Sequence, residues 1–171
     1  VIGAADAVLD GAASVTITDT VALLKDVLTA IAADSSVDSI VISDSLTNLS
    51  AAADATVSAA ASLIIDGQTV AADDAAEVNA LTKPTVYTVN DVYTDFVIDG
   101  AAASDAIGTL IAGAATIEIA DGSINVAEFN VIDGLTDARI MATGGNWLVV
   151  EDTIASLSAT TLDTAALAAR N

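Results

Sequence analysis

The residues of this chain that could do chemistry are its carboxylates. Twenty aspartates and four glutamates stand against two lysines and two arginines, and the chain has neither histidine nor cysteine. The lack of both residue types excludes thiol chemistry, disulfide bonds, Ser-His triads, and zinc or haem binding through these side chains. Two kinds of chemistry remain: acid–base catalysis by paired carboxylates, and the binding of a hard cation such as calcium.

Pairs of carboxylates are the candidates for catalysis. They occur at Asp73-Asp74 and Glu151-Asp152, and as the spaced set Asp91, Asp95 and Asp99. Acid–base work requires two carboxylates in different environments within one cleft, and nothing in the sequence indicates such a cleft. Asp is a favoured helix N-cap, so we interpret these residues as caps and solvated helix faces. No catalytic residue is predicted, and we expect the protein not to be an enzyme.

Calcium binding is the sharper hypothesis for these acids. Asp-Gly occurs five times, at Asp10, Asp66, Asp99, Asp121 and Asp133. If strand-ending aspartates line one edge of a parallel stack, neighbouring strands about 4.8 Å apart allow two carboxylates to share a cation. Neither EF-hand spacing nor a Gly-Gly-x-Gly-x-Asp nonapeptide is present, so capping and turn formation is the alternative role. The candidate calcium ligands are Asp66, Asp91, Asp95, Asp99, Asp121 and Asp152.

A recurring pattern positions the acids. In Ser39–Leu49, the β-branched residues Ile40, Val41 and Ile42 favour a strand. Asp44 and Ser45 then offer side-chain oxygens to the free N–H groups of a helix, and Leu49 follows five residues after the aspartate. The same order of strand, aspartate and large apolar residue recurs in Val15–Leu24, Val86–Phe96 and Trp147–Leu157. The pattern predicts that each aspartate ends a strand and starts a helix.

The alternation of strands and helices predicts an α/β fold. Strand–helix–strand alternation requires parallel pairing and right-handed crossovers. The recurrence favours a solenoid-like stack of repeated β-strand–α-helix units. The alternative is a single open sheet of flavodoxin-like type. We expect residues 1–171 to form one repeat-built domain, either as one subunit or as a segment of a longer assembly.

Several segments carry specific expectations. Helices are predicted over Thr20–Ala33, from Leu46 to about Ala61, and over Thr69–Leu81, Ser104–Ala112, Ala127–Ile132 and Thr153–Ala169. Asp91–Ile98 fits either a helix or a strand, and a helix is favoured. Ala138–Thr143 and Trp147–Val150 flank Gly144-Gly145-Asn146 and are predicted to form a hairpin. Trp147, the single tryptophan, is interpreted as a packing residue rather than a sugar platform.

The composition of the chain limits the classes of partner that it can bind. Hydrophobic residues make up 54% of the chain but aromatic residues only 3%, which predicts a thin core of alanine and branched aliphatic side chains. The net charge of −20 excludes nucleic acid and disfavours an anionic membrane surface, because both attract clustered Lys and Arg. The longest run without a charged residue, Ala106–Ile117, has 12 residues, whereas a membrane-spanning helix needs about 20. No transmembrane segment is therefore expected.

The strand–aspartate pattern resembles the repeat regions of large bacterial surface and secreted proteins, of adhesin, surface-layer and hemolysin-type calcium-binding kinds. Those regions vary the theme strand–Asp-Thr-Ala-x-Asn-Leu–helix. The matching residues are Asp19-Thr20, Asp44-Ser45 with Asn48-Leu49, Asp91 with Phe96, and Asp152-Thr153 with Leu157. Asp91-Val92 departs from the Thr or Ser preference. The resemblance implies a secreted or cell-surface bacterial protein with a structural or adhesive role, and it transfers no catalytic residue.

Three functions stand as hypotheses. The favoured one is a non-enzymatic, self-assembling extracellular protein of a surface layer, filament or adhesin stalk. Copies of the chain would meet through its terminal strands and helices, within Val1–Asp19 and Trp147–Ala169. The alternative is a carbohydrate- or ligand-binding module of a large secreted adhesin, for which a cleft containing Trp147 would be evidence. The third is a small α/β enzyme of a salt-adapted organism, which would require a cleft at the carboxyl ends of the strands.

Overall fold

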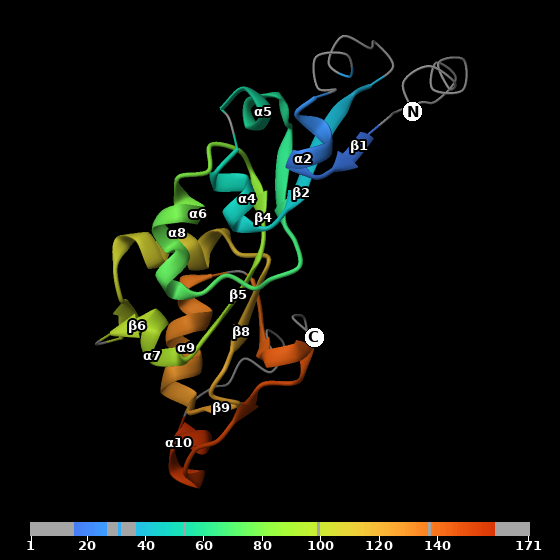
Figure 1. The fold of residues 1–171 in the computed structure, drawn as a ribbon. Helices are drawn as coiled ribbons and strands as arrows, with labels where there is room; N and C mark the ends of the chain where they lie inside the picture. The colour runs from blue at the N-terminus through green and yellow to red at the C-terminus, as the bar shows by residue number, and fades with distance from the viewer. Residues whose placement is uncertain are drawn as a thin grey trace. The chain divides into compact units, whose positions relative to one another are not determined.

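Parallel strands followed by short helices make up the fold (Figure 1). A computed structural model describes residues 16–26, 31, 37–52, 54–98, 100–136 and 138–159. The chain divides into two compact units. The first is Val1–Gln68 with Ala80–Val86, and the second is Thr69–Asn79 with Tyr87–Asn171.

The first compact unit holds one four-stranded parallel sheet. Its strand order follows the chain: β1 (Thr16–Asp19), β2 (Ser39–Asp44), β3 (Ser62–Ile65) and β4 (Thr85–Val86). The helices between these strands are short: α2 (Val21–Leu24), α4 (Leu46–Ser50) and α5 (Asp54–Ala59). The predicted α/β class and parallel pairing are confirmed for this unit.

The second compact unit repeats this arrangement with one exception. Its parallel strands are β5 (Thr88–Asp91), β8 (Thr116–Ile119) and β10 (Arg139–Ala142), together with the pair β9 (Ser123–Ile124) and β11 (Val149–Val150). The exception is the antiparallel pair β6 (Val97–Ile98) and β7 (Ala101–Ala102). The helical segments are η1 (Ala72–Asp74), α6 (Ala75–Asn79), α7 (Tyr93–Phe96), α8 (Asp105–Gly113), α9 (Val126–Leu135), η2 (Thr143–Gly145) and α10 (Ile154–Ala159).

Rows of aliphatic side chains across neighbouring strands form the core. In β2 and β3 buried residues alternate with half-exposed ones, and the register sets buried Ile42 beside buried Leu63. In the second unit the corresponding row is Val89, Ile117 and Ile140. Alternate side chains of a strand point to opposite faces, so one face of each sheet carries the core. Helices α8 and α9 contact each other and lie along the same side of β5 and β8 in Figure 1.

In three of the four copies of the pattern, the apolar residue five positions after the aspartate packs into this core. Leu24, Leu49 and Phe96 are among the most deeply buried side chains. Each such side chain contributes about 1.5–3 kcal/mol by leaving water. The fourth residue of the pattern, Leu157, is exposed.

The helices agree with their predicted bounds to different degrees. Helix α8 matches its prediction to within one residue and α9 exceeds its own, while α10 covers the start of the helix predicted from Thr153, whose residues after Ala159 lie outside the described residues. In the helix predicted over Thr20–Ala33, α2 is followed by a turn at Lys25-Asp26, and Ile31 is again helical and buried. Val27 and Leu28 of the predicted apolar stripe lie outside the described residues.

The helix predicted from Leu46 is divided into α4 and α5. The helix predicted from Thr69 starts only at η1, because Val70 first pairs with Val89 of β5. Asp91–Ile98, for which a helix was favoured over a strand, contains both, because the helix α7 leads directly into the strand β6.

The predicted hairpin around Gly144-Gly145 is wrong. β10 pairs in parallel with β8, and β11 pairs in parallel with β9, so the chain continues in one direction through the glycines. A single antiparallel bridge, between Ala142 and Asn146, is all that resembles a hairpin there. Both neighbouring segments are interrupted by glycine with positive φ: Gly122 between β8 and β9, and Gly144 and Gly145 between β10 and β11. Because glycines interrupt both neighbouring segments, the two segments can change direction at the same level of the sheet.

The packing role expected of Trp147 is also wrong, because 69% of its surface is exposed. It lies in the loop between η2 and β11. Within the described residues, no helix is long and apolar enough to cross a membrane.

Candidate functional site: the aspartates at the strand ends

Asp44 shows what a strand-ending aspartate does in this fold. Its Oδ1 accepts hydrogen bonds from the Ser45 amide at 2.8 Å and from Asn48 Nδ2 at 2.7 Å, both at the start of its own helix α4. Its Oδ2 accepts a hydrogen bond at 3.1 Å from the amide of Val21, the first residue of α2. Because α2 follows β1, the neighbouring strand, one carboxylate holds the starts of two successive helices.

The hydrogen bond from the Val21 amide to Asp44 has counterparts along the chain. We call it the aspartate link: the first helical N–H after one strand donates to an aspartate at, or within two residues after, the end of the neighbouring parallel strand. Besides Asp44, the acceptors are Asp91 for Ala72 at 3.0 Å, Asp121 for Tyr93 at 2.6 Å and Asp152 for Val126 at 3.4 Å. Asp91 and Asp152 also accept from the amide that follows them, as Asp44 does, at 2.9 and 2.6 Å.

Parallel pairing explains why the link recurs. The first N–H groups of a helix have no partner within it, and the helix dipole makes that end attractive to negative charge. Neighbouring parallel strands are about 4.8 Å apart, so a carboxylate at the end of one strand reaches the helix start after the other. A helix of four residues such as α2 or α7 has few bonds of its own, so this external acceptor stabilises a large part of it.

Hydrogen bonds tune the acidity of these groups. Partial burial of Asp44 favours its neutral form, but the bonds from Asn48, Ser45 and Val21 outweigh that effect and lower its pKa. The amide of Thr153, with help from Ser156 and Val126, lowers the pKa of Asp152. A lowered pKa in the folded state means that the links stabilise the fold above the usual aspartate range and lose this effect in more acidic solution.

Asp66 departs from the pattern. It accepts a hydrogen bond from the Gly67 amide at 2.7 Å and one from the Ser43 hydroxyl at 3.3 Å. Gly67 has a φ of 74°, which is suited to glycine in a tight turn. The turn delays the next helix until Ala72, whose amide is held by Asp91 instead. Asp66 is therefore a turn residue with a bond to one neighbouring strand.

Two of the predicted calcium ligands, Asp91 and Asp121, act on a third, Asp95. A side-chain hydrogen bond with Asp91, some desolvation, and the negative charges of Asp91, Asp73 and Asp121 together raise the pKa of Asp95. Asp66 belongs to the first compact unit and Asp91, Asp95, Asp121 and Asp152 to the second, while Asp99 lies outside the described residues. Like charges around Asp95 are a local cost to the fold.

Carboxylate oxygens that would bind calcium already accept hydrogen bonds within the fold. Both oxygens of Asp91 and of Asp152 accept backbone hydrogen bonds. Among the residues that the structure describes, no group of three or more acidic side chains is arranged to hold a metal ion. Calcium binding by the six aspartates stays a prediction, and a bound ion would have to share or displace these amide donors.

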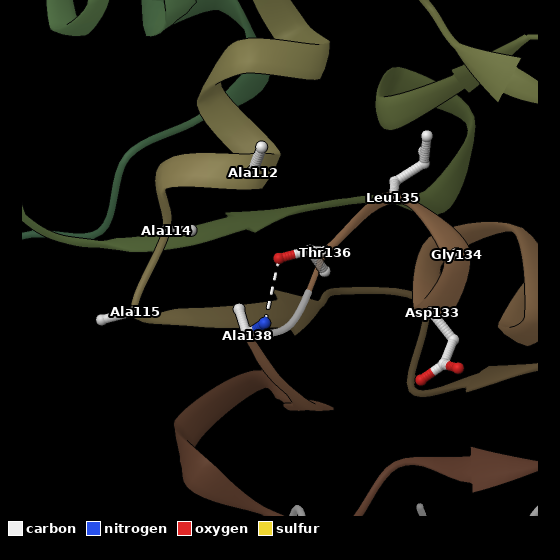
Figure 2. A pocket seen from close by; sticks show the side chains of 8 residues that line it. All are labelled: Ala112, Ala114, Ala115, Asp133, Gly134, Leu135, Thr136 and Ala138. Atoms are coloured by element: carbon white, nitrogen blue, oxygen red, sulfur yellow. Dashed lines mark hydrogen bonds between the residues drawn. The ribbon is translucent and has the colours of Figure 1, made fainter.

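A hollow of about 450 Å³ in the second compact unit is the other candidate site (Figure 2). It lies where α8 and α9 end, and four of its lining residues are alanines: Ala112, Ala114, Ala115 and Ala138. The Thr136 hydroxyl is used inside the fold, because it donates to the Ile111 carbonyl and accepts from the Ala138 amide, both at 3.0 Å. The Asp133 carboxylate points in the opposite direction from the Leu135 side chain. The lining offers no nucleophile with a neighbouring base.

Sequence reasoning found the strand-ending aspartates but missed two of their features. It did not identify the amides after a neighbouring strand as donors, because that requires the strand register. It also missed the N-cap of α9, where the Asn125 amide donates to Glu128 and the Glu128 amide donates to Asn125. The Asn-x-x-Glu spacing was the available signal for this reciprocal cap.

Comparisons with known proteins add no family to this description. The chain matches no protein-family model, no curated protein sequence and no solved structure.

Removing the Asp44 carboxylate tests the link. Asp44→Ala deletes acceptors for two helix starts, so we expect a loss of about 1–3 kcal/mol in the free energy of unfolding, measured with urea. Asp44→Asn keeps one acceptor oxygen and should lose less. Asp26→Ala is the matched control, because Asp26 is exposed in the same compact unit and removes the same charge. Equal effects of Asp44→Ala and Asp26→Ala would contradict the link.

Replacing Asp95 tests the charge repulsion. A raised pKa means that the folded state binds the proton more tightly than the unfolded state, so stability falls as pH rises through the interval between the two pKa values. Asp95→Asn should therefore raise the urea midpoint at pH 7, and the gain should shrink as acidification protonates Asp95 in the wild type. A gain that is the same at pH 3 and pH 7 would exclude this explanation.

Proposed function

We propose that this chain is a non-enzymatic structural protein, built as a solenoid-like stack of strand–helix repeats, that associates with copies of itself outside a bacterial cell. A repeat is here one strand with the helix after it. The observation that carries the proposal is the aspartate link, which joins each linked repeat to the next one through a backbone hydrogen bond.

Strand order supports stacking over the flavodoxin-like alternative. In each compact unit the paired strands follow one another in chain order, β1-β2-β3-β4 in the first and β5-β8-β10 in the second. A doubly wound sheet reverses its order at a switch point, where its ligand site forms. Consecutive order with right-handed crossovers puts all helices on one face and makes each repeat the cover of its neighbour.

The use of the carboxylates supports a structural role. The strand-ending aspartates, which would be the natural acid–base groups, are occupied by amide donors. The alanine-lined hollow has no nucleophile with a neighbouring base in its lining. These two features favour a structural protein over the third hypothesis, an enzyme. The extracellular bacterial location rests on the resemblance of the strand–aspartate motifs.

A second function is favoured by one observation, the exposure of Trp147. Exposed aromatic rings stack on sugars, and Asn146 and Glu151 offer exposed polar groups nearby in the chain. A carbohydrate-binding module would therefore use the segment between η2 and α10. Because the chain has one tryptophan, its fluorescence reports binding of an added oligosaccharide without interference.

Self-association has a direct test. The net charge of −20 makes copies repel one another, and salt reduces the Debye length from about 30 Å at 0.01 M to about 8 Å at 0.15 M. We expect sedimentation velocity and negative-stain electron microscopy to show assemblies that grow with protein concentration and with salt. Calcium should promote assembly beyond a magnesium or ionic-strength control if the aspartates bind it. Monodisperse monomers at high concentration, with and without calcium, would contradict the proposal.

A further inference from the structure

The last copy of the strand–aspartate pattern differs from the others in exposure. The apolar residue five positions after the aspartate is at most 1% exposed in Leu24, Leu49 and Phe96, but 37% exposed in Leu157. The sequence gives no reason for the difference, since the spacing from Asp152 is the same. The internal copies are covered by the repeat that follows them; α2, for example, contacts β2, the next strand. Leu157 lacks such a cover among the described residues.

The neighbouring apolar residues share this exposure. Ile154, the first residue of α10, is 87% exposed, whereas Ala72 and Val126, which hold the equivalent first position after their strands, are buried. Trp147 and Val149 are exposed as well. We call Trp147, Val149, Ile154 and Leu157 the terminal patch. Four large apolar side chains are exposed within eleven residues of the chain. If they form one surface, it is of the kind that binds another protein.

Both terminal strands also have an unpaired edge. Within the described residues, β10 pairs only with β8 and β11 only with β9, while β1 pairs only with β2. A strand with one neighbour presents backbone N–H and C=O groups that another strand can pair with. Among the residues that the structure describes, one parallel edge at β1 and another beside the terminal patch are therefore without a partner strand.

We propose that the terminal patch binds the β1 end of a second copy, so that copies associate head to tail. This inference rests on the proposed self-association and names its surfaces. Within the chain, each repeat contacts the next one through a parallel strand. Where a link is present, the next repeat also supplies the aspartate that accepts the hydrogen bond. The β1 end supplies both: an open strand edge, and Asp19, whose Oδ1 accepts from the Thr20 amide as Asp44, Asp91 and Asp152 accept from theirs. The exposed Leu23 of α2 adds an apolar contact at this end.

Head-to-tail contact has a geometric consequence. The two surfaces are different, so every bound copy presents a new free surface of each kind, and the assembly stays open unless the rotation closes a ring. Filaments rather than closed dimers are the expected product. If one variant cannot bind through the terminal patch and another cannot bind through the β1 end, a mixture of the two should form dimers that do not grow further.

This complementation is the decisive experiment. The patch variant carries Ile154→Asp and Leu157→Asp, and the edge variant carries Asp19→Ala and Leu23→Asp. The control is Ile98→Asp, because Ile98 is also exposed but lies in the antiparallel pair β6–β7, away from both open edges in the pairing. Sedimentation velocity at 0.15 M salt or higher follows wild type, each variant, and an equimolar mixture of the patch and edge variants. Circular dichroism checks that each variant is folded.

The proposal predicts that wild type and Ile98→Asp polymerise alike. Each end variant alone should need an about tenfold or greater increase in concentration to associate. Their mixture should form dimers that do not grow further. If wild type assembles and the end variants assemble equally well, or if the mixture stays monomeric, the head-to-tail junction is wrong while self-association stands. If wild type itself stays monomeric, both proposals fail.

Discussion

The structure depends on a carboxylate that accepts backbone hydrogen bonds from two successive helices. The helices of the described residues have only four to ten residues, and isolated helices shorter than about 12–15 residues are marginal in water. Their formation therefore requires external partners. Aspartates such as Asp44 supply one by accepting the first N–H groups, and the apolar residue five positions later supplies the other by burial. The hydrogen bond of the link and the burial of the apolar residue therefore stabilise the same short helix.

The same acids that build the fold also strain it. Each link places a negative charge at the edge of a sheet, and a net charge of −20 accumulates over the chain. Where several acids meet, as around Asp95, a hydrogen bond with Asp91, desolvation and the repulsion between like charges together raise the pKa. At Asp44 the hydrogen bonds prevail and the pKa falls. Salt, which screens the long-range repulsion more than the short hydrogen bonds, should favour both folding and association.

Local chemistry in the sequence predicted most of the strands, the parallel pairing of all but β6 and β7, and the role of aspartate as a helix start. β-branched triplets such as Ile40–Ile42 and the spacing to Leu49 carry that information directly. The helices predicted from Leu46 and from Thr69 were too long, because alanine-rich segments keep a helical pattern beyond the residues that pack on a sheet, whereas the helix predicted over Ala127–Ile132 was too short. The direction of the chain after Gly144-Gly145 could not be read from two glycines, which suit a reversal and a loop equally. The donors of the links were invisible without the strand register.

Amide hydrogen exchange, resolved by NMR, is the most direct test of this account. The amides of Val21, Ala72, Tyr93 and Val126 are the link donors, and each is the first residue of its helix. The Asp105 amide, the first of α8, is the comparison, because α8 begins with Ser104 as its cap and Asp105 donates in no link. The account predicts slow exchange for the four donors and fast exchange for Asp105. Exchange of the four donors as fast as that of Asp105 would contradict it.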